Sequence, residues 1–278
     1  MRILVTGAGG TLGRAVVPAL VKAGHEVRAL GRPPVGGGDA RWLPGEAVKD
    51  AVRGCDAVLL LPRRDPAADR AAVAASCGAG VPHVLRVSGP ATGRARERLA
   101  DAERLVRTSG LRWTVLRHSH LHQSLDRALR ELAASVVLPV DPSVPWQPVD
   151  AREVAAYLAG LLMGEPRQAA LAYGGPQVLT TPELVGIWLE ARGLRRLRPR
   201  VRYPGRAMAE QRAGRLLVRN APLGTCTWRE WLMPTPVPSD DFAEEHTASP
   251  TSPANQPERD PDLRVYGGDE GYQRQTRA

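Results

Sequence analysis

The sequence predicts an α/β fold in which helices cover both faces of a doubly wound parallel sheet. Three observations predict this fold class. Short apolar stretches alternate with helical patterns from the first residues onward, which is the order of β-α-β units. Residues 57–61 are wholly apolar, as expected of a strand buried on both faces of a parallel sheet. A glycine-rich segment at 7–13 joins the first apolar stretch to the first helical pattern.

The individual elements follow from the spacing of apolar residues. Strands are expected at 3–5, 26–30, 41–43, 57–61, 82–88 and 112–116, and the helices between them at 11–23, 65–79 and 95–109. In the first of these helices, Leu12, Val16 and Leu20 share one face. Gly24 follows the helix at the position where glycine commonly ends one.

After Arg117 the alternation of strands and helices loosens. Helical patterns are expected at 122–134, 152–163, 181–191 and 207–217, with short strands at 170–173 and 201–203. We predict that residues 1–234 form the sheet domain with a small substrate-side lobe over about residues 118–234. From residue 235 to 278, Pro, Ser, Thr, Asp and Glu dominate and apolar periodicity ends, so this tail is predicted to be disordered.

The formal net charge of +9 comes almost entirely from arginine, because Lys22 and Lys49 are the only lysines. The arginines are scattered along the chain, and no aromatic residues alternate with them. This arrangement indicates that the positive net charge serves to bind an anionic cofactor rather than nucleic acid.

The three cysteines, Cys55, Cys77 and Cys226, are far apart and form no CxxC motif, which is typical of reduced thiols in a cytoplasmic protein. No apolar run approaches the roughly 18 residues of a membrane span. The chain opens on a buried-strand pattern rather than on a signal sequence. The sequence thus predicts a cytoplasmic protein that acts on a small molecule, with no nucleic acid and no membrane as partners, and it leaves the oligomeric state open.

The glycine segment is the clearest motif. Gly7 permits a tight turn, Gly10 allows the backbone to approach a pyrophosphate, and Gly13 lets the helix pack close to the strand. Thr11 and Leu12 open the helix, whose free N–H groups would bind the phosphates. The spacing differs from Gly-x-Gly-x-x-Gly, but its place between a strand and an amphipathic helix predicts a Rossmann-type dinucleotide site.

The end of the second strand discriminates between NAD and NADP. An NAD site carries an acid there, which binds the 2′-hydroxyl of the ribose. This chain instead has Leu30-Gly31-Arg32, which places a guanidinium where it can pair with a 2′-phosphate. The predicted cofactor is therefore NADP(H).

A longer series of motifs resembles the atypical short-chain dehydrogenases, and the NmrA-like group of NAD(P)H-binding proteins in particular. The resemblance rests on the glycine segment and on segments 54–59, 80–88, 103–117, 147–155 and 174–180, and it covers about residues 1–234. It implies that Leu61 and Pro62, after the fourth strand, contact the cofactor. It also implies that Ser88 lies near the nicotinamide and that the segment after Arg117 lines the substrate.

One feature of the short-chain dehydrogenases is missing. Their catalytic members use a Tyr-x-x-x-Lys pair, in which the tyrosine transfers the proton. Counted back from Glu103, those two places fall near Ala95 and Leu99, and no Tyr-x-x-x-Lys occurs in the chain. The usual alcohol dehydrogenase mechanism is therefore not expected.

Three histidines, His118, His120 and His122, follow the sixth predicted strand. Histidine titrates near neutral pH, so we predict His122 as a proton donor assisted by Ser88, and His118 as a substrate contact. His118 and His122 also have a spacing that zinc can use, but no nearby Asp, Glu or Cys completes a set, and no metal is expected. Ordinary histidines of a loop or helix start are the plainer alternative. Trp146, after a proline-rich loop, is predicted to line the substrate.

Two functions fit these observations. The first is an NADPH-dependent reductase of a small apolar or quinone-like substrate, because such acceptors need no Tyr-Lys pair and the cofactor carries the chemistry. The alternative is a non-catalytic module that binds NADP(H) and reports redox state to a partner.

Overall fold

The computed structural model describes residues 1–31, 33, 40–44, 47–62 and 65–234. Residues Met1–Thr235 form one compact unit. Arg32 and the tail predicted to be disordered, residues 235–278, lie outside the described residues.

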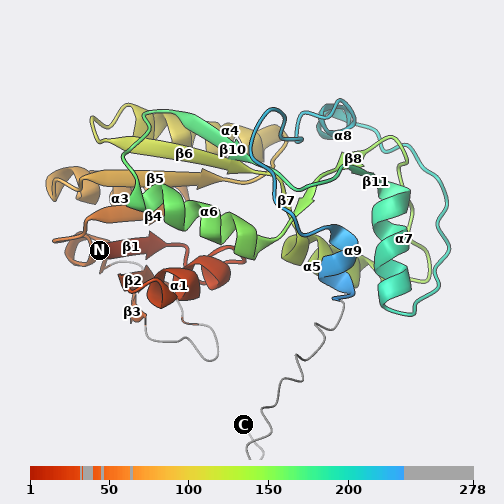
Figure 1. Ribbon diagram of the computed structural model, residues 1–278. Helices are drawn as coiled ribbons and strands as arrows, with labels where there is room; N and C mark the ends of the chain where they lie inside the picture. The colour runs from red at the N-terminus through yellow and green to blue at the C-terminus, as the bar shows by residue number, and fades with distance from the viewer. Residues whose placement is uncertain (32, 34–39, 45–46, 63–64, 235–278) are drawn as a thin grey trace, which may run out of the picture. The chain divides into compact units, whose positions relative to one another are not determined.

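The described chain is built on a parallel sheet of seven strands in the order β10-β6-β5-β4-β1-β2-β3 (Figure 1). The strands are β1 (Arg2–Thr6), β2 (Glu26–Leu30), β3 (Arg41–Leu43), β4 (Ala57–Leu60), β5 (His83–Ser88), β6 (Trp113–His118) and β10 (Ala170–Tyr173). All six neighbouring pairs in this sheet are parallel. The order reverses between β1 and β4, which confirms the predicted doubly wound sheet and places its topological switch point there.

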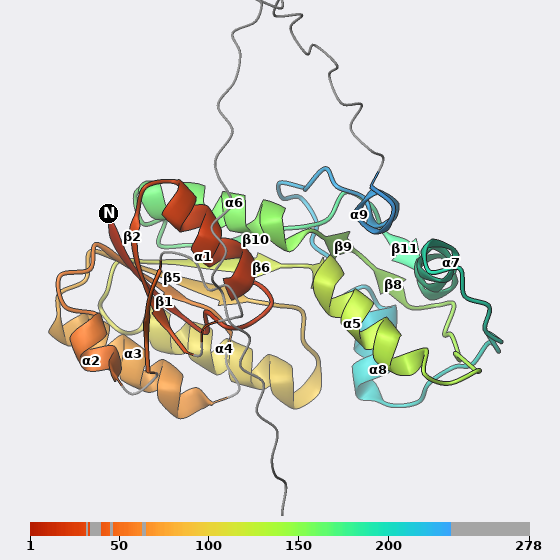
Figure 2. The same ribbon diagram turned by 90° about the horizontal axis from the view of Figure 1, so that it is seen from below.

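Helices cover both faces of the sheet (Figure 2). One face carries α1 (Gly13–Lys22) and α6 (Ala151–Met163), and the other carries α2 (Val48–Ala51), α3 (Pro66–Gly78) and α4 (Gly93–Arg107). The two resulting cores are separate, and each contains alternate residues of the same strands. Leu59 and Leu85 belong to the core under α1 and α6, whereas Val58 and Val84 belong to the core under α3 and α4.

A smaller region with its own core lies beside the carboxyl edge of the sheet (Figure 1). Its helices and strands are β7 (His120–Leu121), α5 (His122–Leu132), β8 (Pro145–Trp146), β9 (Pro148–Val149), β11 (Leu179–Thr180), α7 (Thr181–Ala191), α8 (Arg206–Arg212) and α9 (Trp228–Leu232). Trp188 and Trp228 are fully buried in this core together with Leu125 and Leu129 of α5.

The chain from 118 to 234 does not stay within this smaller region. β10 pairs with β6 as the seventh strand of the main sheet, and α6 packs against α1. The spacing of apolar residues predicts that this strand and this helix exist, but it does not predict which elements they pack against. From the sequence, both were therefore expected in the smaller lobe. Residues 201–203, predicted as a strand, lie in neither a strand nor a helix.

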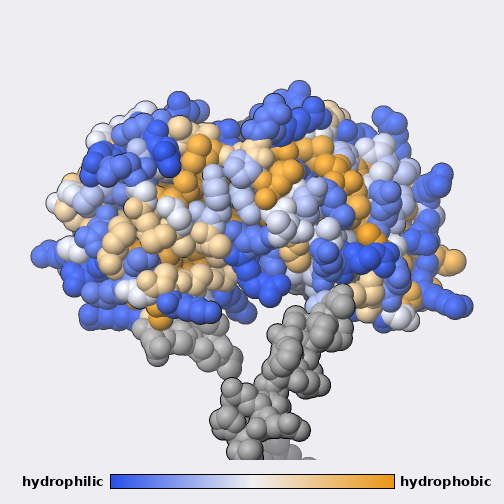
Figure 3. Space-filling model, in the orientation of Figure 1, coloured by the Kyte–Doolittle hydropathy of each residue, from blue (hydrophilic) through white to orange (hydrophobic). Residues whose placement is uncertain are grey.

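The surface of the described unit is mixed. On the face seen in Figure 1, hydrophilic side chains dominate the edges and hydrophobic ones gather over the middle (Figure 3). Among the described residues, no helix is long and apolar enough to cross a membrane.

Candidate functional site

The glycine loop connects β1 to α1 at the switch point of the sheet. Gly7 has a φ of +67°, and its carbonyl accepts a hydrogen bond of 3.0 Å from the Gly10 amide. A Cβ on Gly13 would lie 2.6 Å from the Cα of Ala8, so only glycine lets α1 begin this close to the strand. No side chain caps the N-terminus of α1 and its first turn carries no acid, which leaves the positive end of the helix open to an anion.

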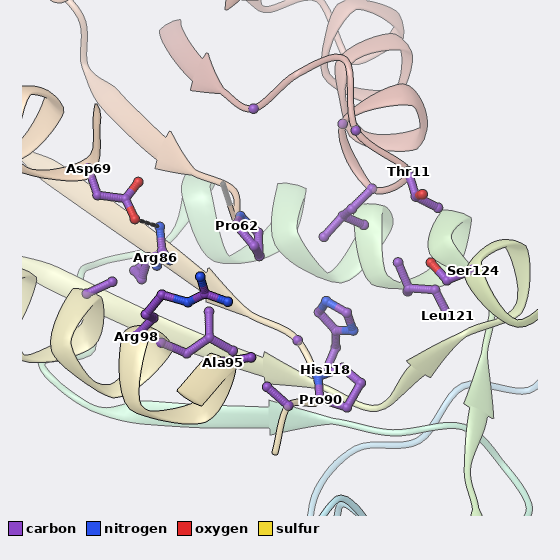
Figure 4. A pocket seen from close by; sticks show the side chains of 18 of the residues that line it. Thr11, Pro62, Asp69, Arg86, Pro90, Ala95, Arg98, His118, Leu121 and Ser124 are labelled. Carbon is purple, nitrogen blue, oxygen red and sulfur yellow. Dashed lines mark ion pairs between the residues drawn. The ribbon is translucent and has the colours of Figure 1, made fainter. Parts of the chain in front are cut away.

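A cavity of about 720 Å³ opens over this loop (Figure 4). It lies outside the carboxyl ends of β1, β4, β5 and β6, which is where open α/β sheets bind their ligands. Its walls come from the glycine loop, the start of α3, the loop after β5, helix α4, the segment after β6 and helix α5. The cradle that only glycine permits and the uncapped helix end fit the pyrophosphate of a dinucleotide.

Most of the residues predicted to bind the cofactor line this cavity: Gly7, Gly10, Thr11, Leu12, Gly13 and Pro62. Leu61 does not, because its side chain is 2% exposed and belongs to the core under α1 and α6. Arg32, from which NADP(H) was predicted, lies outside the described residues.

Ser88 ends β5 but does not line the cavity. Along this strand Leu85 and Val87 face the core under α1 and α6, so Ser88 faces the opposite side, toward Glu103 of α4. Burial raises the pKa of the Glu103 carboxyl, but the hydrogen bonds and positive charge of Arg117 outweigh it and hold the pKa below its ordinary value. The predicted position of Ser88 beside the reacting groups is therefore corrected.

His118, the last residue of β6, lines the cavity as predicted for a substrate contact (Figure 4). Its Nδ1 lies 2.7 Å from the carbonyl oxygen of Ser119, which only accepts hydrogen bonds, so Nδ1 carries the proton and Nε2 is free to accept. Burial lowers the pKa of His118. At neutral pH the imidazole therefore offers a neutral acceptor to the cavity.

His122 lies elsewhere. Its ring is fully buried, with centroids 5.4 Å from Trp228 and 5.5 Å from Trp231, and it is not among the residues that line the cavity. Burial lowers its pKa to about 4. The expectation that His122 faces the pocket is wrong, because Leu121, Ser124 and Leu125 occupy the cavity side of this helix start and His122 points to the other side.

His120 and Trp146 form a pair behind the cavity wall. Their ring centroids are 4.9 Å apart in an edge-on arrangement, and His120 lines the cavity whereas Trp146 does not. The indole Nε1 donates a hydrogen bond of 2.9 Å to the Thr181 hydroxyl. Trp146 therefore fixes His120 rather than lining the substrate, and this prediction is corrected.

The cavity has a charged side that the sequence analysis missed. Arg86 of β5 and Asp69 of α3 form a buried ion pair of 3.0 Å at its wall. Arg70 and Arg98 also line the cavity, as do Ala95 and Leu99, the two places assigned to the missing tyrosine and lysine. In the sequence of a highly charged helix, an arginine that lines a cavity cannot be distinguished from one that is exposed to solvent. The only indication that Arg98 lines the cavity was its position next to Leu99.

Among the described residues, no group of three His, Cys, Asp or Glu side chains could hold a metal ion. The cavity therefore combines a dinucleotide cradle, a neutral histidine, a largely apolar wall on α4 and α5, and arginine side chains.

Comparison with known proteins agrees with this arrangement. Residues 7–163 match the family described as NAD(P)H-binding. A (4-alkanoyl-5-oxo-2,5-dihydrofuran-3-yl)methyl phosphate reductase of Streptomyces griseus is 35% identical over 200 residues, which cover 65% of this chain and 70% of that protein. A 4-hydroxy-tetrahydrodipicolinate reductase of Natronomonas pharaonis is 29% identical over 136 residues, 49% of this chain and 51% of that protein.

Solved structures share the fold. A nucleoside-diphosphate-sugar epimerase of Staphylococcus aureus superposes with a TM-score of 0.66 at 20% identity, over 84% of this chain and 99% of that chain. The triphenylmethane reductase of Citrobacter sp., solved with NADP(H), superposes with a TM-score of 0.59 at 22% identity, over 73% of this chain and 80% of that chain. The chain thus belongs to the NAD(P)H-binding family and is an NAD(P)-dependent oxidoreductase of the atypical short-chain dehydrogenase kind.

Proposed function

We propose that this chain is an NADPH-dependent reductase of small molecules whose double bond is conjugated to a carbonyl group, a class that includes quinones. The observation that carries the proposal is the wall of the cavity at Ala95 and Leu99. A side-chain acid is missing where the short-chain dehydrogenases place one. The preferred acceptor is therefore one whose reduction needs no such acid.

Conjugated acceptors meet this condition. NADPH, when bound, would supply a hydride: its C4–H bond would break to leave NADP⁺, and a new C–H bond would form at the substrate carbon remote from the carbonyl. The electrons of the double bond move onto the carbonyl oxygen and give an enolate, or the anion of a quinol. This anion is stable enough to take its proton from water, so no tyrosine is needed.

The Streptomyces griseus relative supports this substrate class. The compound in its name is a 2,5-dihydrofuran whose ring double bond is conjugated both to the ring carbonyl and to the alkanoyl group. An enolate formed there would be shared between two carbonyls. We propose an acceptor of this type for the present chain.

The cavity residues divide between the two ligands. The backbone of Gly10, Thr11 and Gly13 would bind the pyrophosphate. His118 would accept a hydrogen bond at Nε2 and orient the ligand that faces it. The proposed substrate side is the part of the smaller region formed by α5, where Leu121 and Leu125 line the cavity and exclude water.

NADPH rather than NADH is proposed on the sequence alone, because Arg32 stands where an NAD site carries an acid. Ser88 and His122 were proposed as catalytic residues on the same basis. Since neither lines the cavity, His118 replaces them as the side chain for which we propose a direct role.

The test is the consumption of NADPH, followed at 340 nm, with a panel of quinones, enones and the dihydrofuran methyl phosphate of the relative. We expect turnover with at least one member of the conjugated class and none with saturated ketones or alcohols. If NADPH binds but no acceptor in the panel is reduced, the non-catalytic redox-sensing module becomes the better account.

A further inference from the structure

The charges on the cavity wall are not balanced. Among the described residues that line the cavity, no free acid accompanies the two cationic side chains of Arg70 and Arg98. The lining acids are Asp69, which is paired with Arg86 at 3.0 Å, and Asp101, which pairs with Arg104 of the same helix at 3.3 Å. The wall formed by α3 and α4 therefore carries an excess of positive charge.

Arg98 differs from the other arginines of α4 in its partners. Arg96 lies 3.8 Å from Glu210, Arg104 pairs with Asp101, and Arg107 lies over the Trp113 ring at 5.6 Å. In the described part of the chain Arg98 and Arg70 make no hydrogen bond or ion pair. The Arg98 guanidinium instead extends from α4 into the cavity, toward Pro62 and above Ala95 (Figure 4).

The pyrophosphate of the cofactor does not account for this charge. Its proposed cradle is the glycine loop, which lies across the cavity from α4 (Figure 4). A second anion would therefore have to meet the arginines. A planar guanidinium with several N–H donors binds phosphate oxygens in pairs, whereas a quinone offers it only neutral carbonyl acceptors.

We propose that Arg98, assisted by Arg70, forms a subsite for a phosphomonoester on the substrate. This inference rests on the proposed function, because it takes the remaining space of the cavity to be the substrate site. It narrows the substrate class from conjugated carbonyl compounds in general to those that also carry a phosphomonoester group.

The experiment compares two ligands that differ only in this group: the dihydrofuran methyl phosphate and the alcohol left when its phosphate is removed. Their binding to the chain already saturated with NADP⁺, which has no hydride to transfer, is measured by calorimetry at constant ionic strength. We expect the phosphate ester to bind at least tenfold more tightly than the alcohol, since charge-assisted hydrogen bonds are worth roughly tenfold to a hundredfold.

Variants assign the effect to residues. Arg98→Gln should remove the preference for the ester and leave the affinity for the alcohol and for NADPH unchanged, while Arg98→Lys should restore part of it. Arg94→Gln is the matched control, because Arg94 is an exposed residue of the same helix that does not line the cavity. Equal binding of ester and alcohol to the unmodified chain overturns the proposal. So does an Arg98→Gln variant that weakens NADPH instead of the ester, because Arg98 would then be a cofactor contact.

The two proposals fail in different ways. Binding needs no turnover, so a preference for the ester without NADPH consumption would retain the phosphate subsite and reject the reductase. Reduction of the alcohol and the ester with equal KM would retain the reductase and reject the subsite.

Discussion

The guanidinium of Arg127 in α5 donates a hydrogen bond of 3.2 Å to the hydroxyl of Thr11 in the glycine loop. The two residues are 116 positions apart in the chain. The bond ties the smaller region to the loop that cradles the dinucleotide, and it brings a positive charge beside a residue that lines the cavity.

Arg127→Gln should therefore weaken NADPH binding by about threefold to tenfold, because one charge-assisted hydrogen bond and one cation near the phosphates are lost. Titration of cofactor fluorescence measures the change. Arg130→Gln is the control, since Arg130 lies on the same helix and pairs with Asp126 at 2.8 Å outside the cavity. Equal loss in both variants would show that Arg127 has no special place at the cofactor.

Gly13→Ala should abolish NADPH binding or raise its Kd at least a hundredfold. The added Cβ would collide with the backbone of Ala8, so α1 would have to move away from the cradle. Gly78→Ala is the matched control, because a Cβ there meets nothing within 4 Å. The account of the loop would be wrong if both alanine variants bound NADPH like the parent chain in the same titration.

The preference for NADPH over NADH is predicted to be about tenfold to a hundredfold, the value of a charge-assisted pair with the 2′-phosphate. Arg32→Ala should remove most of it, with little effect on NADH. Competition between the two cofactors in fluorescence titration measures both. If the variant kept the same preference for NADPH over NADH, residues other than Arg32 would determine that preference.

His118→Leu should lower kcat/KM about tenfold or more at unchanged NADPH affinity, because the acceptor at Nε2 is lost from the cavity. His122→Leu should leave the kinetic constants of the folded protein almost unchanged, since His122 packs against Trp228 and Trp231 and does not line the cavity. Steady-state kinetics with one acceptor compares the two variants. The reverse ranking would return the proton-transfer role to His122.

The buried His122 should make the protein less stable in acid. Its pKa is lowered by burial from 6.5 to about 4 in the folded chain, so the unfolded chain binds the proton first. The stabilising effect of neutral His122 is complete above pH 6.5 and is lost as the pH falls toward 4.

Between pH 7 and pH 5 this amounts to about 2 kcal/mol in the free energy of unfolding. His122→Phe keeps an aromatic ring against the two tryptophans without a titrating group. Urea unfolding at the two pH values should show a smaller pH dependence in this variant than in the parent chain. Parallel pH profiles would mean that His122 does not titrate as proposed.

The sheet and the cofactor loop could be predicted from the sequence because each depends on local signals. A fully apolar stretch such as 57–61 implies a strand covered on both faces. Gly7 and Gly13 stand at a strand-to-helix turn, where the local backbone geometry requires residues without a side chain. Both features were present in the linear pattern before any tertiary contact was known.

The substrate side could not be predicted in the same way. Whether His118 or His122 faces the cavity depends on the residue at which α5 begins, and a shift of one residue on a helix turns a side chain by about 100°. Arg98 gave no distinct signal, because only the three-dimensional structure shows that the neighbouring acids pair with other arginines and that Arg98 has no ion-pair partner among the described residues. The position of β10 depends on β6, more than 50 residues earlier in the chain.

Hydride transfer to a conjugated double bond without a side-chain acid is tested most directly by following an isotope. Reduction of the dihydrofuran substrate with NADPH that carries two deuterium atoms at C4 of the nicotinamide would be followed by mass spectrometry and NMR. We predict one deuterium at the ring carbon remote from both carbonyls, and a hydrogen from solvent at the carbon between them. Deuterium at a carbonyl carbon, or no transfer to a substrate that binds the NADPH complex, would contradict the account.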